Sequence, residues 1–439
     1  MQTHHTQEVT LSVQAELRFL PVATWFVEKS AIAFGMEEPE ALSLMLATEE
    51  LFAYLCRVNA SGHLLMRCRS GGYYVEQEFV FHADYFNMKA FNITTVPDLD
   101  EQGGIDETGL LIASRMVDRF QLFEEDGGLR LVLTKEKAYP ESAEIVIPLA
   151  MPLKEFVVKV PGPEELKFFV HLVNHHYAPQ VVPLSFNFPG KVADMAACGA
   201  CCAAIAVDVA GRIGGGIVWR WEGSKLVEFY GPYLFNQSRE SGMAEALVDR
   251  CLSATARTKA IGLINRYPTA ELPIEYFEPL GSLTSRMEDG SELAFSAYFR
   301  HLEEDLGSTV WAHSLIENFL VDQYRRLFFA REIRQVRDEG ESGSPFSVLS
   351  AEFDRSAGRV TLHPIWWGKD SRETLSAYVD TLRNEGLAGI FFEMDVGTSW
   401  QCRFAPALLQ TGFEPRLVIP HAGTGDIVVF QHTTGKSVP

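Results

Sequence analysis

A six-residue segment in the middle of the chain, RESGMA, has residue types and a spacing that can bind a diphosphate. The first turn of a helix exposes amide hydrogens that no helix carbonyl accepts, and the positive end of the helix dipole lies there. Gly242 lets the backbone approach a pyrophosphate closely, and Arg239 adds a positive charge. Because an apolar strand pattern precedes the segment and a helical pattern follows it, we expect a phosphate-binding turn. Its residues are Arg239, Glu240, Ser241, Gly242, Met243 and Ala244.

The elements that must position this turn resemble those of the GNAT superfamily of acyl-CoA N-acyltransferases. The segment FVVKVPGPEELKFFVHLV resembles the opening strand and helix of that superfamily. The segment IAVDVAGRIGGGIVWR resembles its second and third strands. The turn itself matches the family pattern Arg/Gln-x-x-Gly-x-Gly/Ala. The resemblance implies that acetyl-CoA or coenzyme A binds at residues 239–244.

The resemblance also implies two residues for proton transfer. Glu228, on the strand before the turn, corresponds to the family's general base, and Tyr276 lies beside the position of its general acid, where this chain has Phe277. The acceptor would be a cationic amine, which the acidic chain favours. The alternative is a turn that no longer binds the coenzyme, with an exposed glutamate and a packed tyrosine that have no catalytic role.

A second copy of the same architecture follows. Residues 347–430 repeat the order of elements in residues 201–283, and the segment LLQTGFEPR resembles GNAT sequences. The corresponding loop in this copy departs from the coenzyme-binding pattern, so we expect a structural or substrate-shaping partner. Between the copies, we expect residues 291–337 to be mostly helical.

The first region, residues 7–137, has the order strand, two helices, two strands, loop, helix and two strands, which predicts an α+β sandwich. The segments LSLMLATEELFAYLCR and TGLLIASRMVDRFQLFEEDGGLRLVLTK, the latter containing a helix expected at residues 110–120, resemble the anti-sigma-factor serine kinase (RsbW-like) branch of the GHKL ATPases.

In that family, a helix Asn binds magnesium and a Glu four residues earlier orients the attacking water. This chain keeps the Glu as Glu50 but has Tyr54 at the Asn position, and a tyrosine is not an oxygen ligand of that kind. Gly104 and Gly109 remain as a possible phosphate-facing turn, but carboxylates surround them. The resemblance therefore implies a degenerate nucleotide site, which disfavours ATP and magnesium.

Composition limits the partners. Lys and Arg total 38 and Asp and Glu total 58, so the formal charge of −20 argues against nucleic acid and anionic membranes. The seven cysteines are odd in number and scattered, which favours reduced thiols, and we expect no metal centre. With no signal-peptide pattern and no apolar run of about 20 residues, we expect a soluble, cytoplasmic protein.

These observations predict an α+β protein of three domains: a GHKL-type α/β sandwich, followed by two GNAT-like mixed-sheet α/β domains. The boundaries are 1–138, a linker at 139–154, 155–290, and 291–439 with its helical segment. The first hypothesis is a regulatory protein whose first domain binds a sigma-factor-like or anti-anti-sigma-like partner and whose second half binds acyl-CoA. The alternatives are an N-acetyltransferase that acts on a cationic amine, and an active ATP-dependent serine kinase.

Overall fold

The computed structural model describes residues 7–58, 62–82, 88–95, 104–125, 128–141, 147, 149–286, 292–336 and 344–433. The chain divides into two compact units. Unit 1 comprises Met1–Tyr139, Gly343–Ala351 and Pro364–Thr374, and unit 2 comprises Pro140–Ser342, Glu352–His363 and Leu375–Pro439. The expected boundaries at 138, 154 and 290 remain predictions.

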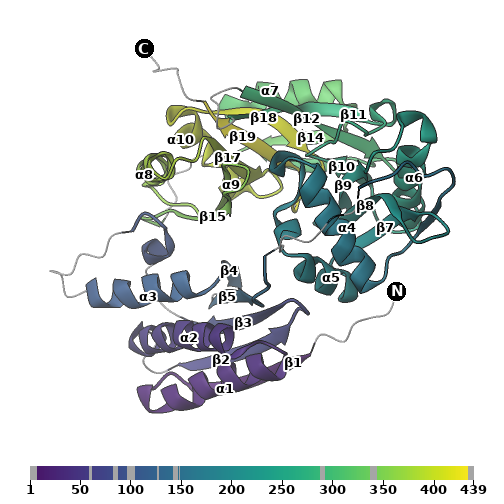
Figure 1. Ribbon diagram of the computed structural model, residues 1–439. Coiled ribbons are helices and arrows are strands. Elements are labelled where there is room, and N and C mark those ends of the chain that lie inside the picture. Colours follow the sequence, from purple (N-terminus) through teal and green to yellow (C-terminus); the bar gives the residue numbers. More distant parts are fainter. Residues whose placement is uncertain are drawn as a thin grey trace. The chain divides into compact units, whose positions relative to one another are not determined.

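Unit 1 has one five-stranded antiparallel sheet of order β1-β2-β3-β5-β4, with helices packed on it (Figure 1). The strands are β1 (Glu8–Gln14), β2 (His63–Ser70), β3 (Tyr74–Phe81), β4 (Arg119–Glu125) and β5 (Gly128–Glu136). The helices are η1 (Leu17–Phe19), α1 (Leu20–Ala33), α2 (Glu38–Val58), η2 (Met88–Phe91) and α3 (Gly104–Met116). The helix expected at residues 110–120 therefore starts and ends earlier, because Arg119 and Phe120 already pair with β5.

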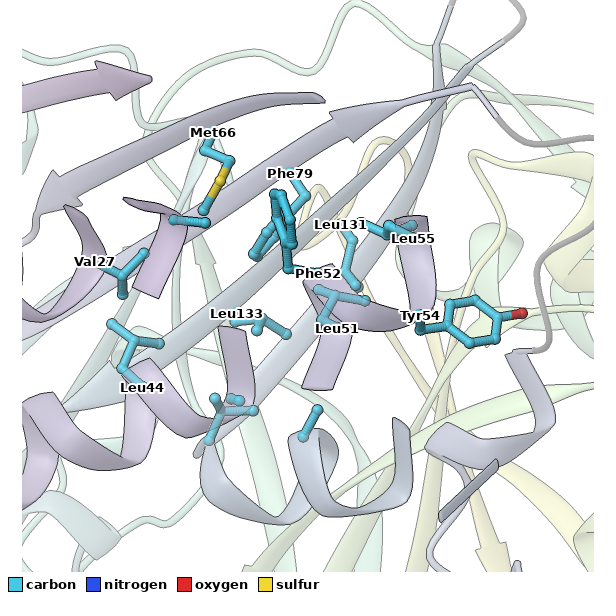
Figure 2. Packing of buried hydrophobic residues seen from close by; sticks show 14 of the residues in the cluster. Val27, Leu44, Leu51, Phe52, Tyr54, Leu55, Met66, Phe79, Leu131 and Leu133 are labelled. Carbon is cyan, nitrogen blue, oxygen red and sulfur yellow. The ribbon is translucent and has the colours of Figure 1, made fainter. Parts of the chain in front are cut away.

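Alternate residues of the strands form the core of unit 1 against the helices. Met66 of β2, Phe79 of β3 and Leu133 of β5 are fully buried and pack against Leu44 and Phe52 of α2 (Figure 2). This alternation is the period-two pattern of a sheet with one face covered by helices.

A short segment from much later in the sequence completes unit 1. The buried side chain of Asn92 donates through Nδ2 to the Ser347 carbonyl at 2.7 Å and accepts from the Leu349 amide through Oδ1 at 3.0 Å. Val348 lies between them in the sequence and belongs to the same apolar core. An amide side chain that offers one donor and one acceptor in this way pairs with the backbone as a neighbouring strand would.

Unit 2 contains a seven-stranded mixed sheet of order β11-β12-β10-β9-β8-β7-β6 (Figure 1). Its strands are β6 (Val157–Lys159), β7 (Cys202–Val207), β8 (Ile213–Glu222), β9 (Leu226–Leu234), β10 (Gly262–Asn265), β11 (Glu278–Arg286) and β12 (Glu292–His301). Its helices are α4 (Pro163–His176), η3 (Pro179–Val181), η4 (Leu184–Asn187), α5 (Pro189–Ala197), η5 (Arg239–Ser241), α6 (Met243–Thr255) and η6 (Ile274–Tyr276). Gly216 permits close packing, because a Cβ there would lie 2.5 Å from the Phe169 ring.

A second sheet has the order β15-β16-β17-β19-β18 and repeats part of the first. In each sheet a parallel strand pair, β9 with β10 or β16 with β17, continues through antiparallel pairing into a final hairpin. The remaining elements are β13 (Ser308–Ala312), α7 (Ser314–Arg326), β14 (Arg331–Gln335), β15 (Val348–Asp354), β16 (Arg359–Trp366), α8 (Ser371–Asn384), β17 (Gly389–Asp395), α9 (Ser399–Cys402), α10 (Ala405–Gln410), β18 (Phe413–Ile419) and β19 (Ile427–His432).

A buried glutamine links the two repeated sheets within unit 2. The Nε2 atom of Gln431 on β19 donates to the Thr284 carbonyl on β11 at 2.6 Å, and its Oε1 accepts from the Thr284 amide at 3.0 Å. The two sheets therefore share backbone-type hydrogen bonds through a side chain.

The expectation of mostly helical structure for residues 291–337 is wrong. This stretch contains strands β12, β13 and β14, and α7 is its only described helix. The alternating apolar residues Phe295, Ala297 and Phe299 on β12 are a strand pattern that the sequence analysis missed. With β12 the first sheet continues past residue 290 and has the same final hairpin as the second.

The α+β fold class is confirmed, since both units combine helices with antiparallel or mixed sheets. None of the helices in the described part of the chain combines the length and apolar character needed to cross a bilayer.

Asn92→Ala tests the contribution of the late segment to unit 1. The substitution leaves the Ser347 carbonyl and the Leu349 amide without these partners, so we expect a loss of about 1–3 kcal/mol and a lower thermal midpoint. Thr95→Ala is the control, because the Thr95 hydroxyl makes an exposed, local hydrogen bond to the Lys89 carbonyl. Equal midpoints for the two variants in calorimetry would contradict this interpretation.

Candidate functional site

The predicted phosphate-binding turn is present between β9 and α6. Arg239, Glu240 and Ser241 form the 3₁₀ turn η5, and Gly242 follows with φ = 69°, a left-handed conformation that favours glycine. The helix α6 begins at Met243, as the sequence pattern indicates. Apart from Gly242 and its two chain neighbours, nothing lies within 4 Å of the position that a Cβ on Gly242 would take, so the space above this residue is open.

The amides of this turn divide into two groups. The Glu240 amide donates to Ser238 Oγ at 3.2 Å, and the Met243 amide donates to Ser241 Oγ at 3.3 Å. In this fully described turn, the amides of Gly242, Ala244 and Glu245 have no hydrogen-bond partner. These three amides can bind an anion, against the repulsion of the carboxylates on Glu240 and Glu245.

The gap where β9 and β10 diverge is bridged by the chain's own side chains. The recorded pairing of these parallel strands ends at Glu228 and Ile264. Beyond it, Asn265 Nδ2 donates to the Gly231 carbonyl at 2.8 Å and Thr269 Oγ1 donates to the Pro232 carbonyl at 2.7 Å. The carbonyls of Gly231 and Pro232 are therefore already hydrogen-bonded within the chain.

Arg239 is also bound to this bridging segment, since its Nη2 donates to the Ala270 carbonyl at 2.6 Å. The guanidinium keeps further N–H groups beyond this one. It can therefore anchor the turn and contribute positive charge to it.

Glu228 is fully buried in a network of charged groups. Its carboxylate accepts two hydrogen bonds from Arg266, at 2.6 and 3.1 Å, one from Arg220 at 3.1 Å and one from the Tyr230 hydroxyl at 2.5 Å. Burial alone would raise the pKa of Glu228, but the charges of Arg266 and Arg220 outweigh it and hold the pKa at about 2. A carboxylate that is ion-paired and weakly basic is a poor proton acceptor.

The same network joins the two repeated sheets of unit 2. Arg266, one residue past β10, also donates through Nη1 to Glu393 of β17 at 2.9 Å. Beside this bridge is a cavity of about 20 Å³, lined in part by Tyr267 and Arg359. The cavity is large enough for about one water molecule. Arg266 therefore holds the same part of both repeats together.

Tyr276 differs from Glu228 in its environment. It ends η6, is 41% exposed, and has the Arg300 guanidinium over its ring at 5.7 Å. The sequence alternative of an exposed glutamate and a packed tyrosine is thus reversed, because the glutamate is buried and the tyrosine is exposed. The roles of both residues in proton transfer remain predictions.

In unit 1 the structure brings Glu50 and Gly109 together. A Cβ on Gly109 of α3 would lie 2.5 Å from Glu50 Oε2, so the glycine admits the carboxylate against the helix. Tyr54, one turn further along α2, is buried beside the apolar core, with its hydroxyl pointing away from Leu51 (Figure 2). Gly104 is the first residue of α3.

Two charged residues of this network, Arg266 and Glu393, were not predicted from the sequence. Arg266 and Glu393 each interrupt or end an otherwise apolar strand, and a charge in such a position is a signal of buried ion pairing. Within the described residues, no group of three His, Cys, Asp or Glu side chains is arranged to hold a metal ion.

No protein-family model matches the chain, and no curated protein sequence matches it. Two solved structures similar to part of the chain are a GNAT superfamily phosphinothricin acetyltransferase from Sinorhizobium meliloti in complex with AcCoA and a GNAT family N-acetyltransferase from Escherichia coli in complex with CoA. The first is 17% identical, covers 34% of this chain and 89% of that chain, and has a TM-score of 0.29. The second is 15% identical, covers 37% and 87%, and has a TM-score of 0.26.

The RsbU and RsbW domains of a Mycobacterium tuberculosis protein are also similar to part of the chain. They are 12% identical, with 31% of this chain covered and a TM-score of 0.23. This chain spans 34% of that one. All three TM-scores are low.

Glu228→Gln tests the buried network. The change leaves Arg266 and Arg220 without their carboxylate, and we expect a loss of about 3 kcal/mol at neutral pH. Because the folded-state pKa is lowered from its ordinary value of 4.5 to about 2, this contribution is present above pH 4.5 and is lost as the pH falls toward 2. The difference in thermal midpoint from the unchanged protein should therefore shrink on acidification.

Glu332→Gln is the matched control, since Glu332 forms an exposed ion pair with Arg334 at 3.2 Å and lies outside the network. We expect it to cost less than about 1 kcal/mol. A variant Glu228→Gln as stable as the control would show that the network contributes little.

Proposed function

We propose that this chain is a regulatory protein that binds coenzyme A or acetyl-CoA at the turn 239–244 without transferring the acyl group through Glu228. The observation that carries the proposal is a turn with open amides next to a strand whose carboxylate is ion-paired. Binding of the coenzyme requires free amides in the turn 239–244, and acyl transfer requires a basic Glu228. The chain meets the requirement for binding better than the requirement for transfer.

Binding of the diphosphate is supported by three features of the turn. Gly242 holds a left-handed conformation with open space above it, and the amides of Gly242, Ala244 and Glu245 have no partner in the described turn. Arg239 adds positive charge at the same place. A helix of 13 residues follows, whose dipole favours an anion at its start.

Acyl transfer is less supported because Glu228, the predicted general base, is ion-paired with two arginines. Proton abstraction by Glu228 requires release from Arg266 and Arg220, with both guanidinium groups left close to the sheet interior. A transfer to a cationic amine remains the second candidate, favoured by the exposed Tyr276 and by the charge of −20. It would need a base other than Glu228.

In this proposal, unit 1 is a protein-binding module rather than a kinase. Tyr54 stands where a magnesium ligand is needed and is buried beside the core. The partner we propose is a sigma-factor-like or anti-anti-sigma-like protein, on the basis of the sequence resemblance. The acyl-CoA state of unit 2 would then be the signal that the protein reports.

Coenzyme A should raise the thermal midpoint of the full chain, because a ligand that binds the native state stabilises it. Arg239→Glu should weaken binding at least about 10-fold in calorimetric titration, through the reversed charge. Gly242→Ala should weaken it about 10-fold, because the added Cβ meets no atom but disfavours the left-handed backbone.

Arg250→Glu is the matched control, with the same change of charge at an exposed position further along α6, and should bind as the unchanged protein does. Pantetheine, which lacks the diphosphate, should give no shift. Absence of any binding of coenzyme A would refute the proposal. Steady release of coenzyme A from acetyl-CoA in the presence of an amine would also refute it, if the Glu228→Gln substitution abolished that release.

ATP with magnesium should leave the thermal midpoint unchanged, since Tyr54 does not supply the oxygen ligand that the cation needs. Coenzyme A in a parallel titration is the positive control. If ATP binds the unchanged protein but not the Glu50→Ala variant, this expectation is wrong and the kinase alternative is supported.

A further inference from the structure

A short segment that precedes β6 is hydrogen-bonded to the side chain of Gln237. The Oε1 atom of Gln237 accepts from the Leu153 amide at 2.9 Å, and its Nε2 donates to the Met151 carbonyl at 3.1 Å. The same Nε2 donates to the Phe235 carbonyl at 2.7 Å, which fixes the orientation of the side chain. We call residues 150–153 the strap. Gln237 binds the strap as a neighbouring strand would, with one donor and one acceptor.

The strap contacts both ends of the turn that precedes α6. At the start of the turn, Asn236 donates through Nδ2 to the Ala150 carbonyl of the strap at 2.8 Å. At its end, Leu153 of the strap and Met243, the first residue of α6, meet over Gly214. A Cβ on that glycine would lie 2.6 Å from Leu153 Cδ1 and 2.9 Å from Met243 Cε. The strap is therefore bonded before the turn and packed against the residue that ends it.

Few buried contacts hold the strap in place. Met151 is 53% exposed, and Leu153 is only partly buried. The hydrogen bonds from Asn236 and Gln237 to the strap carbonyls are exposed as well. Segments with few buried apolar contacts and with exposed hydrogen bonds open more readily than the core of a domain. Docking of the strap is therefore an equilibrium that a ligand at the turn can shift.

We propose that docking of the strap and binding of coenzyme A at the turn 239–244 favour each other, with Gln237 as a positioning residue. This inference rests on the coenzyme binding proposed above. A docked strap restricts both ends of the turn, so less conformational entropy is lost when the turn binds a diphosphate. Because coupling between two equilibria is reciprocal, bound coenzyme A stabilises the docked strap by the same factor.

The sequence of the strap and its place in the chain fit this role. None of its four residues, Ala-Met-Pro-Leu, is charged, so in a chain of net charge −20 the strap does not repel a diphosphate. Along the sequence it follows the first segment of unit 1, which ends at Tyr139. A change in strap docking therefore changes the point at which the chain from unit 1 is anchored on unit 2. This gives the coenzyme state a physical route to the rest of the protein.

Hydrogen exchange of the full chain, followed at the Leu153 amide, tests the coupling. Saturating coenzyme A should slow exchange of this amide at least about 5-fold in the unchanged protein. Gln237→Ala removes the acceptor of this amide, so exchange without ligand should be faster, and calorimetric titration should show coenzyme A binding at least about 5-fold weaker. Leu153→Ala loosens the strap without changing the turn, and it should weaken binding in the same direction.

Gln335→Ala is the matched control for the loss of an amide side chain. Gln335 of β14 also donates through Nε2, to Glu317 Oε2 at 2.7 Å, but it belongs neither to the strap nor to the turn. This variant should bind coenzyme A as the unchanged protein does, and exchange at Leu153 should slow equally when coenzyme A is added. Circular dichroism shows whether each variant is folded.

Two results would overturn the coupling and leave the proposed function standing. One is coenzyme A that binds the unchanged protein without slowing exchange at Leu153. The other is a folded Gln237→Ala variant that binds coenzyme A as tightly as the Gln335→Ala control. Failure of coenzyme A to bind the unchanged protein would instead overturn the proposed function, and this inference with it.

Discussion

The guanidinium of Arg266, between Glu228 and Glu393, is the interaction on which the arrangement of unit 2 depends. A charge buried among apolar strands is costly unless its hydrogen-bonding groups are satisfied. Arg266 is satisfied by two carboxylates, one from each repeated sheet, and Glu228 is in turn satisfied by Arg220 and Tyr230. The repeats are therefore joined through charges that neither sheet could bury alone. Glu228, predicted from the sequence as a general base, is thus also part of the bridge between the two sheets.

The buried glutamine on β19 complements this bridge at another place in the same unit. Gln431 satisfies both backbone groups of Thr284, so the hairpins that end the two sheets are linked without a continuous strand ladder. Directional contacts of this kind fix register, whereas apolar packing alone tolerates sliding. Together, the ion pairs and the glutamine explain how two repeats of low mutual identity form one compact unit.

Much of the fold could be predicted because local patterns determine it. The strands of unit 1 alternate regularly, and the turn before Met243 has glycine and charge in their expected places. The prediction was wrong for residues 291–337, where β12 mixes aromatic, polar and charged residues and its strand partner β10 is more than 20 residues away. The partners of Glu228 could not be assigned for the same reason. Arg266 is 38 positions from Glu228 and 127 positions from its second partner, Glu393, and only the folded sheets bring these residues together.

Unit 1 includes two segments from the last third of the sequence, and this limits how the protein can be divided. Val348 lies in its core, with the partly buried Ile365 and Trp366 packed against it, and Asn92 bonds the backbone on either side of Val348. A fragment that ends at residue 139 would have an incomplete core, in which Asn92 lacks its hydrogen bonds to Ser347 and Leu349. A cut of the chain or of its gene between residues 139 and 343 therefore does not release an intact unit 1, because unit 1 needs segments from both sides of the cut.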